Sequence, residues 1–301
     1  FQNEMENFFS NKKPRFNPFF IPKLIADIAP GLISIKYGFR GPNFATVSAC
    51  ASSSNAIIDA LNYIRLGYAD VMIAGGSEAA VTCAGIGGFN AMHALSTRNN
   101  EPDKASRPFD NERDGFVLGE GGGCIVLEDL DHAIKRNAKI YCELAGGGLS
   151  ADAHHMTAPH PEGNGAKKVM ENCLQDAKLN IDEVDHINMH GTSTPLGDIA
   201  ETKAVIDVFK KHAYSININS TKSMTGHLLG AAGAIEAISC ILSIKNNKIP
   251  PTINHFTNDK QIDSKLNFTF NKFQERSVRV ALSNTFGFGG HNACLVFKKF
   301  D

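Results

Sequence analysis

The 301-residue sequence lacks several features that mark common functional classes. Its formal net charge is only −1, so it has no basic excess of the kind that nucleic-acid binding needs. The one basic run, Asn11–Arg15, is short and stands beside prolines, which favours a solvated loop. No uninterrupted apolar stretch of about 18 residues occurs, which argues against a membrane span. We therefore expect neither a nucleic acid nor a membrane as partner.

Recognisable metal, disulfide and nucleotide spacings are missing too. The seven cysteines are scattered without a CxxC pair, which fits a reducing compartment. The histidine-rich stretch Asp152–His160 has no regular ligand spacing, so we expect no metal there. Neither Gly119–Gly123 nor "SNTFGFGGHN" matches G-x-G-x-x-G or a P-loop, so we expect no dinucleotide or phosphate cradle. The start shows no signal-peptide pattern and no initiator Met, as if the chain were cut from a longer one.

Short apolar runs alternate with helical patterns along the chain. Strands are predicted at residues 43–49, 69–76, 122–129, 139–147, 184–191, 214–221, 279–287 and 292–298. Apolar residues at helical spacing predict helices at residues 57–67, 166–178, 199–211 and 231–246. The run 69–76 is typical of a buried parallel strand. This alternation predicts an α/β protein whose sheets are covered on both faces.

Two stretches share a faint internal similarity. "VSACASSSNAIIDAL" and "STKSMTGHLLGAAGAIEAI" both run from a strand through a turn of small residues into a helix. Taken alone this is a weak repeat, and it matters only if the fold is duplicated.

Three stretches place reactive side chains among small neighbours. Cys50 stands at a strand-to-helix turn, where it is either a buried space-filler or a thiolate stabilised by the helix N-terminus. His190 ends an apolar strand, and Lys222 and His227 stand five residues apart ahead of a small-residue helix. A single histidine at a strand end is more often structural, but glycine and alanine neighbours let a ligand approach. A cysteine with two histidines is the set expected where a thiol attacks a carbonyl.

The stretch "SNTFGFGGHN" is a fourth candidate. It is either a flexible hairpin or a loop whose exposed backbone N–H groups stabilise an oxyanion.

In combination, five motifs resemble the β-ketoacyl-[acyl-carrier-protein] synthases, the type II elongating condensing enzymes of fatty acid synthesis. The motifs span the chain in this order: "ACASSSNAI", "RPFDNERDGFVLGEG", "HGTSTPLGD", "STKSMTGHLLGAAGAIEA" and "NTFGFGGHN". The resemblance implies a thiolase-like fold of five αβαβα layers, made of two similar halves at residues 1–138 and 139–301. It also implies that the first half is incomplete, because family members carry further elements, including one wall of the acyl pocket, before the region matching Phe1.

The resemblance further implies a role for each matching residue. Cys50 matches the acyl-accepting nucleophile, and His190 and His227 match the two active-site histidines. Lys222 matches the lysine that supports the site electrostatically, and Glu236 matches the buried acid behind it.

The remaining matches concern the substrate. Phe288 matches the gating phenylalanine, whose backbone N–H joins that of Cys50 in the oxyanion hole. Phe89 matches a phenylalanine that lines the acyl tunnel, and Thr192 and Thr194 match the pair that contacts the pantetheine arm.

The implied activity is decarboxylative condensation of malonyl-carrier protein with an acyl group held on Cys50. It needs no metal and no organic cofactor, and its partner is acyl carrier protein in acyl- and malonyl-loaded forms. A homodimer and a bacterial cytoplasmic location are implied, with an organelle matrix as the alternative. The histidine in "TGH" distinguishes the chain from the initiating synthases, which have an asparagine there.

Three other functions remain open. A polyketide-type ketosynthase shares these motifs, whereas "HGTSTPLGD" and "RPFDNERDGF" disfavour a thiolase. A non-catalytic partner subunit or inactive fragment is the alternative outside the enzymes, and the intact Cys–His–His set weighs against an inactive partner.

Overall fold

The computed structural model describes residues 1–11 and 15–301, so most of the basic run Asn11–Arg15 lies outside the described residues. The chain divides into two compact units, Phe1–Thr46 and Val47–Asp301. The first unit contains α1 (Gln2–Ser10), α2 (Phe20–Leu24) and α3 (Ile28–Tyr37), and none of these helices contains a buried residue. Its aromatic rings stack on one another instead, with Phe16 4.6 Å from Phe8 and 5.2 Å from Phe20.

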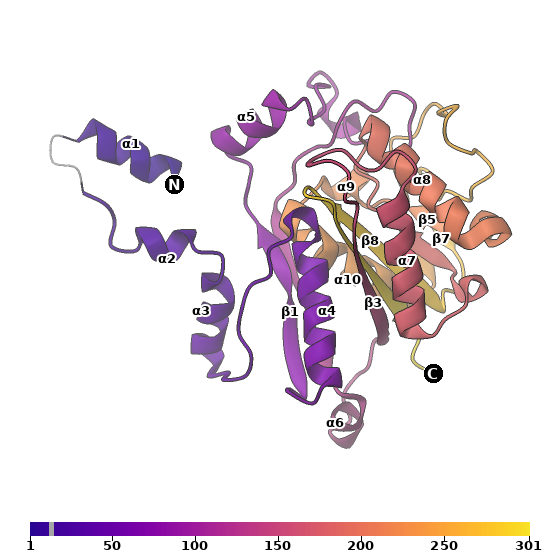
Figure 1. Cartoon of the computed structure of the whole chain (residues 1–301), viewed down its shortest axis with the longest axis horizontal. Helices are drawn as coiled ribbons and strands as arrows, with labels where there is room; N and C mark the ends of the chain where they lie inside the picture. Colours follow the sequence, from indigo (N-terminus) through magenta and orange to yellow (C-terminus); the bar gives the residue numbers. More distant parts are fainter. Residues whose placement is uncertain (12–14) are drawn as a thin grey trace. The chain divides into compact units, whose positions relative to one another are not determined.

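The second unit is built around a five-stranded mixed sheet (Figure 1). Its strands lie in the order β3 (Glu143–Ala151), β9 (His291–Lys298), β8 (Val280–Gly287), β4 (His186–Asn188) and β5 (Asn217–Asn219). The strands β3, β9 and β8 pair antiparallel, whereas β8, β4 and β5 run parallel. The parallel part matters for function, because it aligns the carboxyl ends of three strands.

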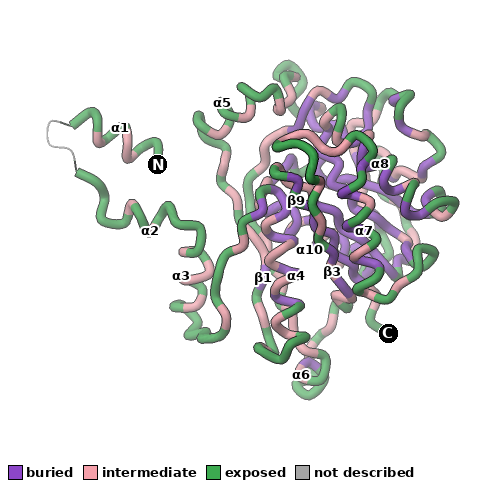
Figure 2. Tube along the Cα trace, in the orientation of Figure 1, coloured by how far each residue is buried: buried purple, intermediate pink, exposed green. Residues whose placement is uncertain are grey.

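Helices cover both faces of this sheet. Val280 and Leu282 on β8 pack in a cluster with α7 (Asn164–Ala177) and α8 (Pro195–Phe209). Ala281, between them, packs in a second cluster with α4 (Ser52–Arg65) and α10 (Ala232–Asn246). Successive side chains of a strand point to opposite faces, so the two helix pairs lie on opposite sides. Figure 2 shows the buried residues concentrated in the sheet and in α10.

A second sheet packs on the far side of α4 and α10. It consists of β1 (Val71–Glu78) and β2 (Gly121–Glu128), with partly buried Met72, Ile125 and Leu127 packing into the α4–α10 cluster. The second unit therefore has helix, sheet, helix and sheet layers. The fifth layer of the predicted αβαβα arrangement stays a prediction.

Two strand predictions are wrong. The run 69–76 was predicted to be a buried parallel strand, but β1 pairs antiparallel with β2 and leaves Val71 and Ile73 exposed. Only one face of β1 packs against helices, but the residues on its outer face are apolar too. The sequence pattern therefore resembles that of a strand buried on both faces. Residues 43–48 belong to no strand, and Ala49 begins a 3₁₀ turn. An apolar β-branched run becomes a strand only where a neighbouring backbone completes the ladder.

The other predicted strands and helices form, with shifted ends. The predicted strands at 184–191 and 214–221 shorten to three residues each in β4 and β5. The smaller elements are α5 (Cys83–Ala91), α6 (Leu130–Lys135), α9 (Lys222–Thr225), β6 (Lys248–Ile249), β7 (Gln274–Glu275) and the 3₁₀ turns η1 (Ala49–Ala51), η2 (Pro102–Lys104), η3 (Ile181–Glu183), η4 (Lys210–Tyr214) and η5 (Leu229–Ala231).

Among the described residues, one helical segment, Leu229–Asn246, is long and apolar enough by length and composition to cross a membrane. Half of it is buried inside the protein, and α10 supplies Ala237, Cys240 and Ile244 to the core. Its apolar character is accounted for by packing within the protein.

The two similar stretches of the sequence adopt the same local structure. Each has a 3₁₀ turn whose first residue has a positive φ, 51° at Ala49 and 45° at Leu229, followed by a long helix. The two helices, α4 and α10, meet at small residues, where the N–H of Ala234 donates to Ser53 Oγ at 3.0 Å.

Candidate active site

The site forms at one edge of the five-stranded sheet. The carboxyl ends of the parallel strands β4, β5 and β8 meet there. His190 follows β4 by two residues, Lys222 begins α9 shortly after β5, and Phe288 follows β8. Cys50 reaches the same edge from η1, at the N-terminus of α4. The topology thus joins side chains that are up to 238 residues apart in the sequence, from Cys50 to Phe288.

Cys50 and His227 are in direct contact. The Sγ atom of Cys50 lies 3.2 Å from Nε2 of His227, within hydrogen-bonding distance. The β8–β9 turn comes equally close on the other side of Cys50. A Cβ atom on Gly287 would lie 2.6 Å from the carbonyl oxygen of Ser48 and 3.1 Å from the Cys50 nitrogen. Only glycine permits this approach, which brings the Phe288 backbone beside the sulfur.

The environment of Cys50 differs from the sequence-based expectation. Burial raises the pKa of the Cys50 thiol to about 11, while the charge of Lys222 and the backbone N–H groups of Phe288 and Cys50 act to lower it. The helix N-terminus therefore does not by itself make Cys50 a thiolate at neutral pH. The backbone N–H groups of Phe288 and Cys50 lie beside the sulfur, and the oxyanion hole that they are predicted to form stays a prediction.

The two histidines face each other as neutral rings. The rings of His190 and His227 are 5.2 Å apart and nearly perpendicular. Burial, assisted by the positive charge of Lys222, holds the pKa of both imidazoles well below 6.5. At neutral pH each ring thus carries one N–H donor and one acceptor.

Lys222 and Glu236 form a buried ion pair behind the histidines. The Lys222 side chain is 1% exposed and its Nζ donates to Glu236 Oε1. Burial raises the pKa of Glu236 to about 7, and Lys222 opposes this increase. Neither residue is part of the cavity lining, so the pair acts on the site through its charge.

A cavity of about 660 Å³ opens onto Cys50, His190 and His227. Phe89 from α5 and Phe288 from the β8–β9 turn line it, with ring centroids 6.5 Å apart. Thr192 and Thr194 line it from the loop after β4, and their hydroxyl oxygens are 3.0 Å apart. The structure thus brings all the predicted substrate-contacting residues to one cavity.

Two residues near the site were not singled out from the sequence. The carboxylate of Glu201 accepts hydrogen bonds from the N–H groups of His190 at 2.8 Å and Gly191 at 2.9 Å. Burial raises the pKa of Glu201 to about 7, against the lowering effect of these donors. The Phe116 ring meets that of His227 edge-on at 5.3 Å. An acid amid the apolar residues of α8 was the available signal for Glu201, and Phe116 ends the "RPFDNERDGF" stretch.

Among residues 1–11 and 15–301, no group of three or more His, Cys, Asp or Glu side chains is arranged to hold a metal ion. His155 and His160 of the histidine-rich stretch line the cavity, and their Nδ1 atoms accept hydrogen bonds from nearby backbone N–H groups. These bonds order the loop at the cavity wall.

A thiol beside two neutral imidazoles in a largely apolar cavity is typical of enzymes that transfer acyl groups through a cysteine thioester. Two sequence models of one family match the chain. The beta-ketoacyl synthase N-terminal domain matches residues 2–133, and the C-terminal domain matches residues 141–256. The chain belongs to the beta-ketoacyl synthase family.

Curated relatives and solved structures agree with this assignment. The chain is 51% identical to the 3-oxoacyl-[acyl-carrier-protein] synthase 2 of Coxiella burnetii and 50% identical to that of Synechocystis, covering 95% of this chain and 68% of each relative. A structure of a type II PKS acyl-carrier protein in complex with its ketosynthase superimposes with a TM-score of 0.94 at 35% identity, over all of this chain and 76% of that one. A beta-ketoacyl synthase from Burkholderia phymatum superimposes with a TM-score of 0.86 at 37% identity. The superposition covers 91% of this chain and 66% of that one.

Proposed function

We propose that this protein is an elongating 3-oxoacyl-[acyl-carrier-protein] synthase that condenses malonyl-carrier protein with an acyl group bound to Cys50. The observation that carries this function is the contact between Cys50 Sγ and His227 Nε2, at 3.2 Å, with His190 facing the same cavity. The curated relatives at about 50% identity bear this activity in their names.

The first half-reaction loads the acyl group. The sulfur of Cys50 attacks the carbonyl carbon of an acyl-carrier thioester, and the carrier's thiol leaves. Because burial keeps Cys50 a thiol, its proton needs an acceptor, and the neutral Nε2 of His227 lies next to the sulfur. His227 takes this proton and passes it to the departing thiolate of the carrier. The backbone N–H groups of Cys50 and Phe288 stabilise the tetrahedral oxyanion.

The second half-reaction forms the carbon–carbon bond. Malonyl-carrier loses carbon dioxide, and the electrons of the broken bond pass into an enolate. Once Cys50 is acylated, His190 and His227 donate to the enolate oxygen in the neutral tautomers whose N–H faces the cavity. The enolate carbon attacks the acyl-Cys50 carbonyl, and the tetrahedral intermediate collapses. Cys50 leaves as a thiolate that takes up one proton from solvent. Lys222 supports the developing negative charge electrostatically.

The substrate contacts follow from the cavity. Phe89 lines the acyl chain's path, Phe288 gates it, and the hydroxyls of Thr192 and Thr194 contact the pantetheine arm. The partner is acyl carrier protein, and the solved structure of a type II PKS carrier bound to its ketosynthase supports this pairing.

The organisation we propose is two thiolase-like halves, 1–138 and 139–301. The matching η1–α4 and η5–α10 units, one from each half, support the duplication. We also infer a homodimer in the bacterial cytoplasm. All seven cysteines are free, which suits a reducing compartment, and the curated relatives come from bacteria.

A polyketide-type ketosynthase is the second candidate. The similarity to a type II PKS ketosynthase, with a TM-score of 0.94, favours it. The two differ in product, because a fatty-acid enzyme accepts chains whose β-carbon has been fully reduced. Mass spectrometry of products from saturated acyl-carrier and from β-ketoacyl-carrier substrates separates them.

Separate assays of the two half-reactions test the mechanism. Cys50→Gln should abolish condensation but retain malonyl-carrier decarboxylation, since the neutral amide mimics an acyl thioester. His190→Ala should lower decarboxylation by about 10²–10³-fold, the usual loss for one donor to an oxyanion, with little effect on acylation. His227→Ala should lower both, since Nε2 of His227 lies 3.2 Å from the sulfur.

Released carbon dioxide and the mass of the acyl-enzyme report the two steps. Normal decarboxylation by both histidine variants would contradict the assigned roles. A wild-type protein that forms no acyl-Cys50 would support the inactive partner subunit instead.

A further inference from the structure

The segment Ser106–Gly119 contains the "RPFDNERDGF" motif, which the mechanism above does not use. It contains no helix or strand, yet residues 105–110 are all buried. It touches two catalytic elements directly. Ser106 Oγ donates to the carbonyl oxygen of Lys222 at 2.7 Å, and the carbonyl oxygen of Val117 accepts from the N–H of His227 at 2.7 Å. Several of its other contacts are with the threonine loop, which we define as Thr192–Pro195.

Arg113 provides the strongest of these contacts. Its Nε donates to the carbonyl oxygen of Thr194 at 3.1 Å, and its Nη2 donates to that of Pro195 at 2.8 Å. The side chain is 2% exposed, so water does not replace these bonds. Two parallel bonds from one rigid, planar guanidinium fix the direction of two successive peptide groups.

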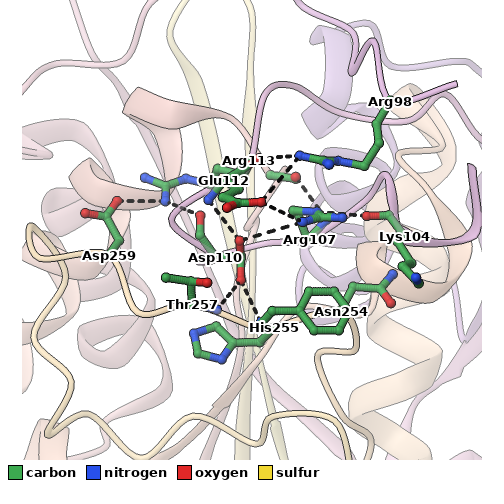
Figure 3. Close-up of polar contacts among 12 residues, drawn as sticks. Arg98, Lys104, Arg107, Asp110, Glu112, Arg113, Asn254, His255, Thr257 and Asp259 are labelled. Atoms are coloured by element: carbon green, nitrogen blue, oxygen red, sulfur yellow. Dashed lines mark hydrogen bonds and ion pairs between the residues drawn. The ribbon is translucent and has the colours of Figure 1, made fainter. Parts of the chain in front are cut away.

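Two carboxylates and the backbone carbonyl of Asp110 hold the guanidinium in this position. Arg113 Nη1 donates to Asp259 Oδ2 at 2.8 Å (Figure 3). Its Nε lies 3.4 Å from Asp198 Oδ2. Asp110 fixes the segment itself, because its carboxylate accepts from the N–H groups of Phe256 and Thr257, at 2.6 and 2.7 Å. The carboxylates therefore balance the positive charge of Arg113. They also fix the orientation of its guanidinium, together with the carbonyl oxygens of Thr194 and Pro195.

The threonine loop contains a residue that needs such support. Ser193 has a φ of 68°, in the left-handed region that side-chain-bearing residues seldom adopt. Its Oγ accepts from the N–H of Arg107 at 3.0 Å, and its carbonyl oxygen accepts from the N–H of Gly115 at 3.1 Å. This conformation turns the backbone between Thr192 and Thr194, so that both threonines line the cavity with hydroxyl oxygens 3.0 Å apart.

We propose that Arg113 is a positioning residue for the pantetheine arm, because its paired bonds to Thr194 and Pro195 hold the threonine loop in its strained turn. This inference rests on the proposed function. It assigns recognition of the pantetheine arm, but not of the acyl chain, to the buried hydrogen bonds and ion pairs around Arg113. Arg113 does not line the cavity, so it acts on the arm through the threonine loop. A lysine keeps the charge but lacks the fork, so it does not orient two peptide groups at once.

The test compares two acyl donors with the same acyl group. One is a pantetheine thioester and the other is an N-acetylcysteamine thioester, which lacks most of the arm. Acylation of Cys50 is followed by protein mass, and kcat/KM is measured for each donor. Wild type should prefer the pantetheine donor. In Arg113→Lys this preference should fall by up to about tenfold, the equivalent of one or two hydrogen bonds, through KM more than kcat.

Two controls separate positioning from general destabilisation. Arg276→Lys changes another hydrogen-bonded arginine, whose Nη1 donates to Ser215 and Asn217 away from the cavity, and it should leave the preference unchanged. Alkylation of Cys50 by iodoacetamide should proceed at the wild-type rate in Arg113→Lys, because the nucleophile is not displaced.

The outcomes are distinguishable. If wild type is acylated by neither donor, the proposed function fails and this inference falls with it. If wild type prefers pantetheine and Arg113→Lys keeps the full preference, Arg113 has no positioning role while the proposed function stands. If Arg113→Lys does not fold, Ser193→Ala decides, since alanine keeps the strained φ but loses the bond to Arg107. A reduced preference supports the positioning role, and an unchanged one overturns it.

Discussion

At the scale of single residues, Cys50 is subject to opposing influences. Its burial beside apolar groups disfavours the thiolate, whereas Lys222 and two backbone N–H groups favour it. Lys222 acts on the histidines as well, because its charge helps to keep both imidazoles neutral. One buried cation thus favours the nucleophilic form of the cysteine and the neutral form of the histidines, which has one N–H donor and one acceptor nitrogen.

Removing this cation should raise the thiol pKa further above about 11. In Lys222→Met, the rate of Cys50 alkylation by iodoacetamide should be lower than in wild type at every pH between 6 and 10. The decrease should be about tenfold for each unit of pKa change, because only the thiolate reacts. Exposed Cys83, mapped in the same digests, provides the internal reference.

Lys222→Met also leaves Glu236 buried without its partner, so the double variant Lys222→Met/Glu236→Gln serves as the control for folding. A Cys50 alkylation profile identical to wild type in both variants would show that Lys222 does not tune the thiol.

At the scale of elements, the position of Cys50 depends on how closely α4 approaches α10. Gly233 on α10 faces Ser54 on α4, and a Cβ atom there would lie 2.1 Å from Ser54 Oγ and 3.1 Å from the Ser54 nitrogen. The 3₁₀ turn that carries Cys50 leads directly into α4. Any separation of the two helices therefore moves the nucleophile relative to His227.

Gly233→Ala should destabilise the protein by about 1–3 kcal/mol, the usual cost of overpacking a tight contact. The matched control is Gly87→Ala on α5, where a Cβ would meet nothing within 4 Å. That change should be neutral or stabilising by up to about 1 kcal/mol, since alanine is the better helix former. Urea unfolding measures both, and equal effects of the two substitutions would mean that the α4–α10 contact is not tight.

At the scale of the whole molecule, the outer face of β1 and β2 is exposed and apolar. Val71, Ile73 and Val126 are 42%, 40% and 61% exposed, and Ile73 pairs with Val126 across the ladder. The sheet has only two strands in the described part of the chain, so β1 pairs with a strand along one edge only. A contiguous apolar face beside an unpaired edge favours association.

We therefore predict that the chain self-associates through this face. Ile73→Lys/Val126→Lys should shift the apparent mass toward the monomer in light scattering coupled to size-exclusion chromatography, because edge charges oppose strand pairing. Leu66→Lys, which replaces a 70%-exposed leucine at the end of α4, should leave the mass unchanged. Equal apparent masses for wild type and the double variant would contradict this prediction. A shared mass above that of the monomer would show association through another surface, and a shared monomer mass would show no association.

The sequence by itself determined which side chains carry the chemistry. Cysteine, histidine and lysine are recognisable by type, and their glycine- and alanine-rich neighbours mark places where a ligand approaches. The long helices and most strands were also predictable, because apolar periodicity is a local property of the chain. The resemblance of five ordered motifs to one family added the roles, and the comparisons agree with that family.

Only the tertiary structure decided how these residues act on one another. Sequence spacing holds no information on whether Cys50 meets His227, which lies 177 positions away, because that contact depends on strand order and helix packing. Burial is likewise a property of the folded molecule, and it reversed the expectation for the Cys50 thiol. The same holds for β1, whose apolar outer face suggested a buried strand, and for Arg113, whose bonds to the threonine loop join residues more than 80 positions apart.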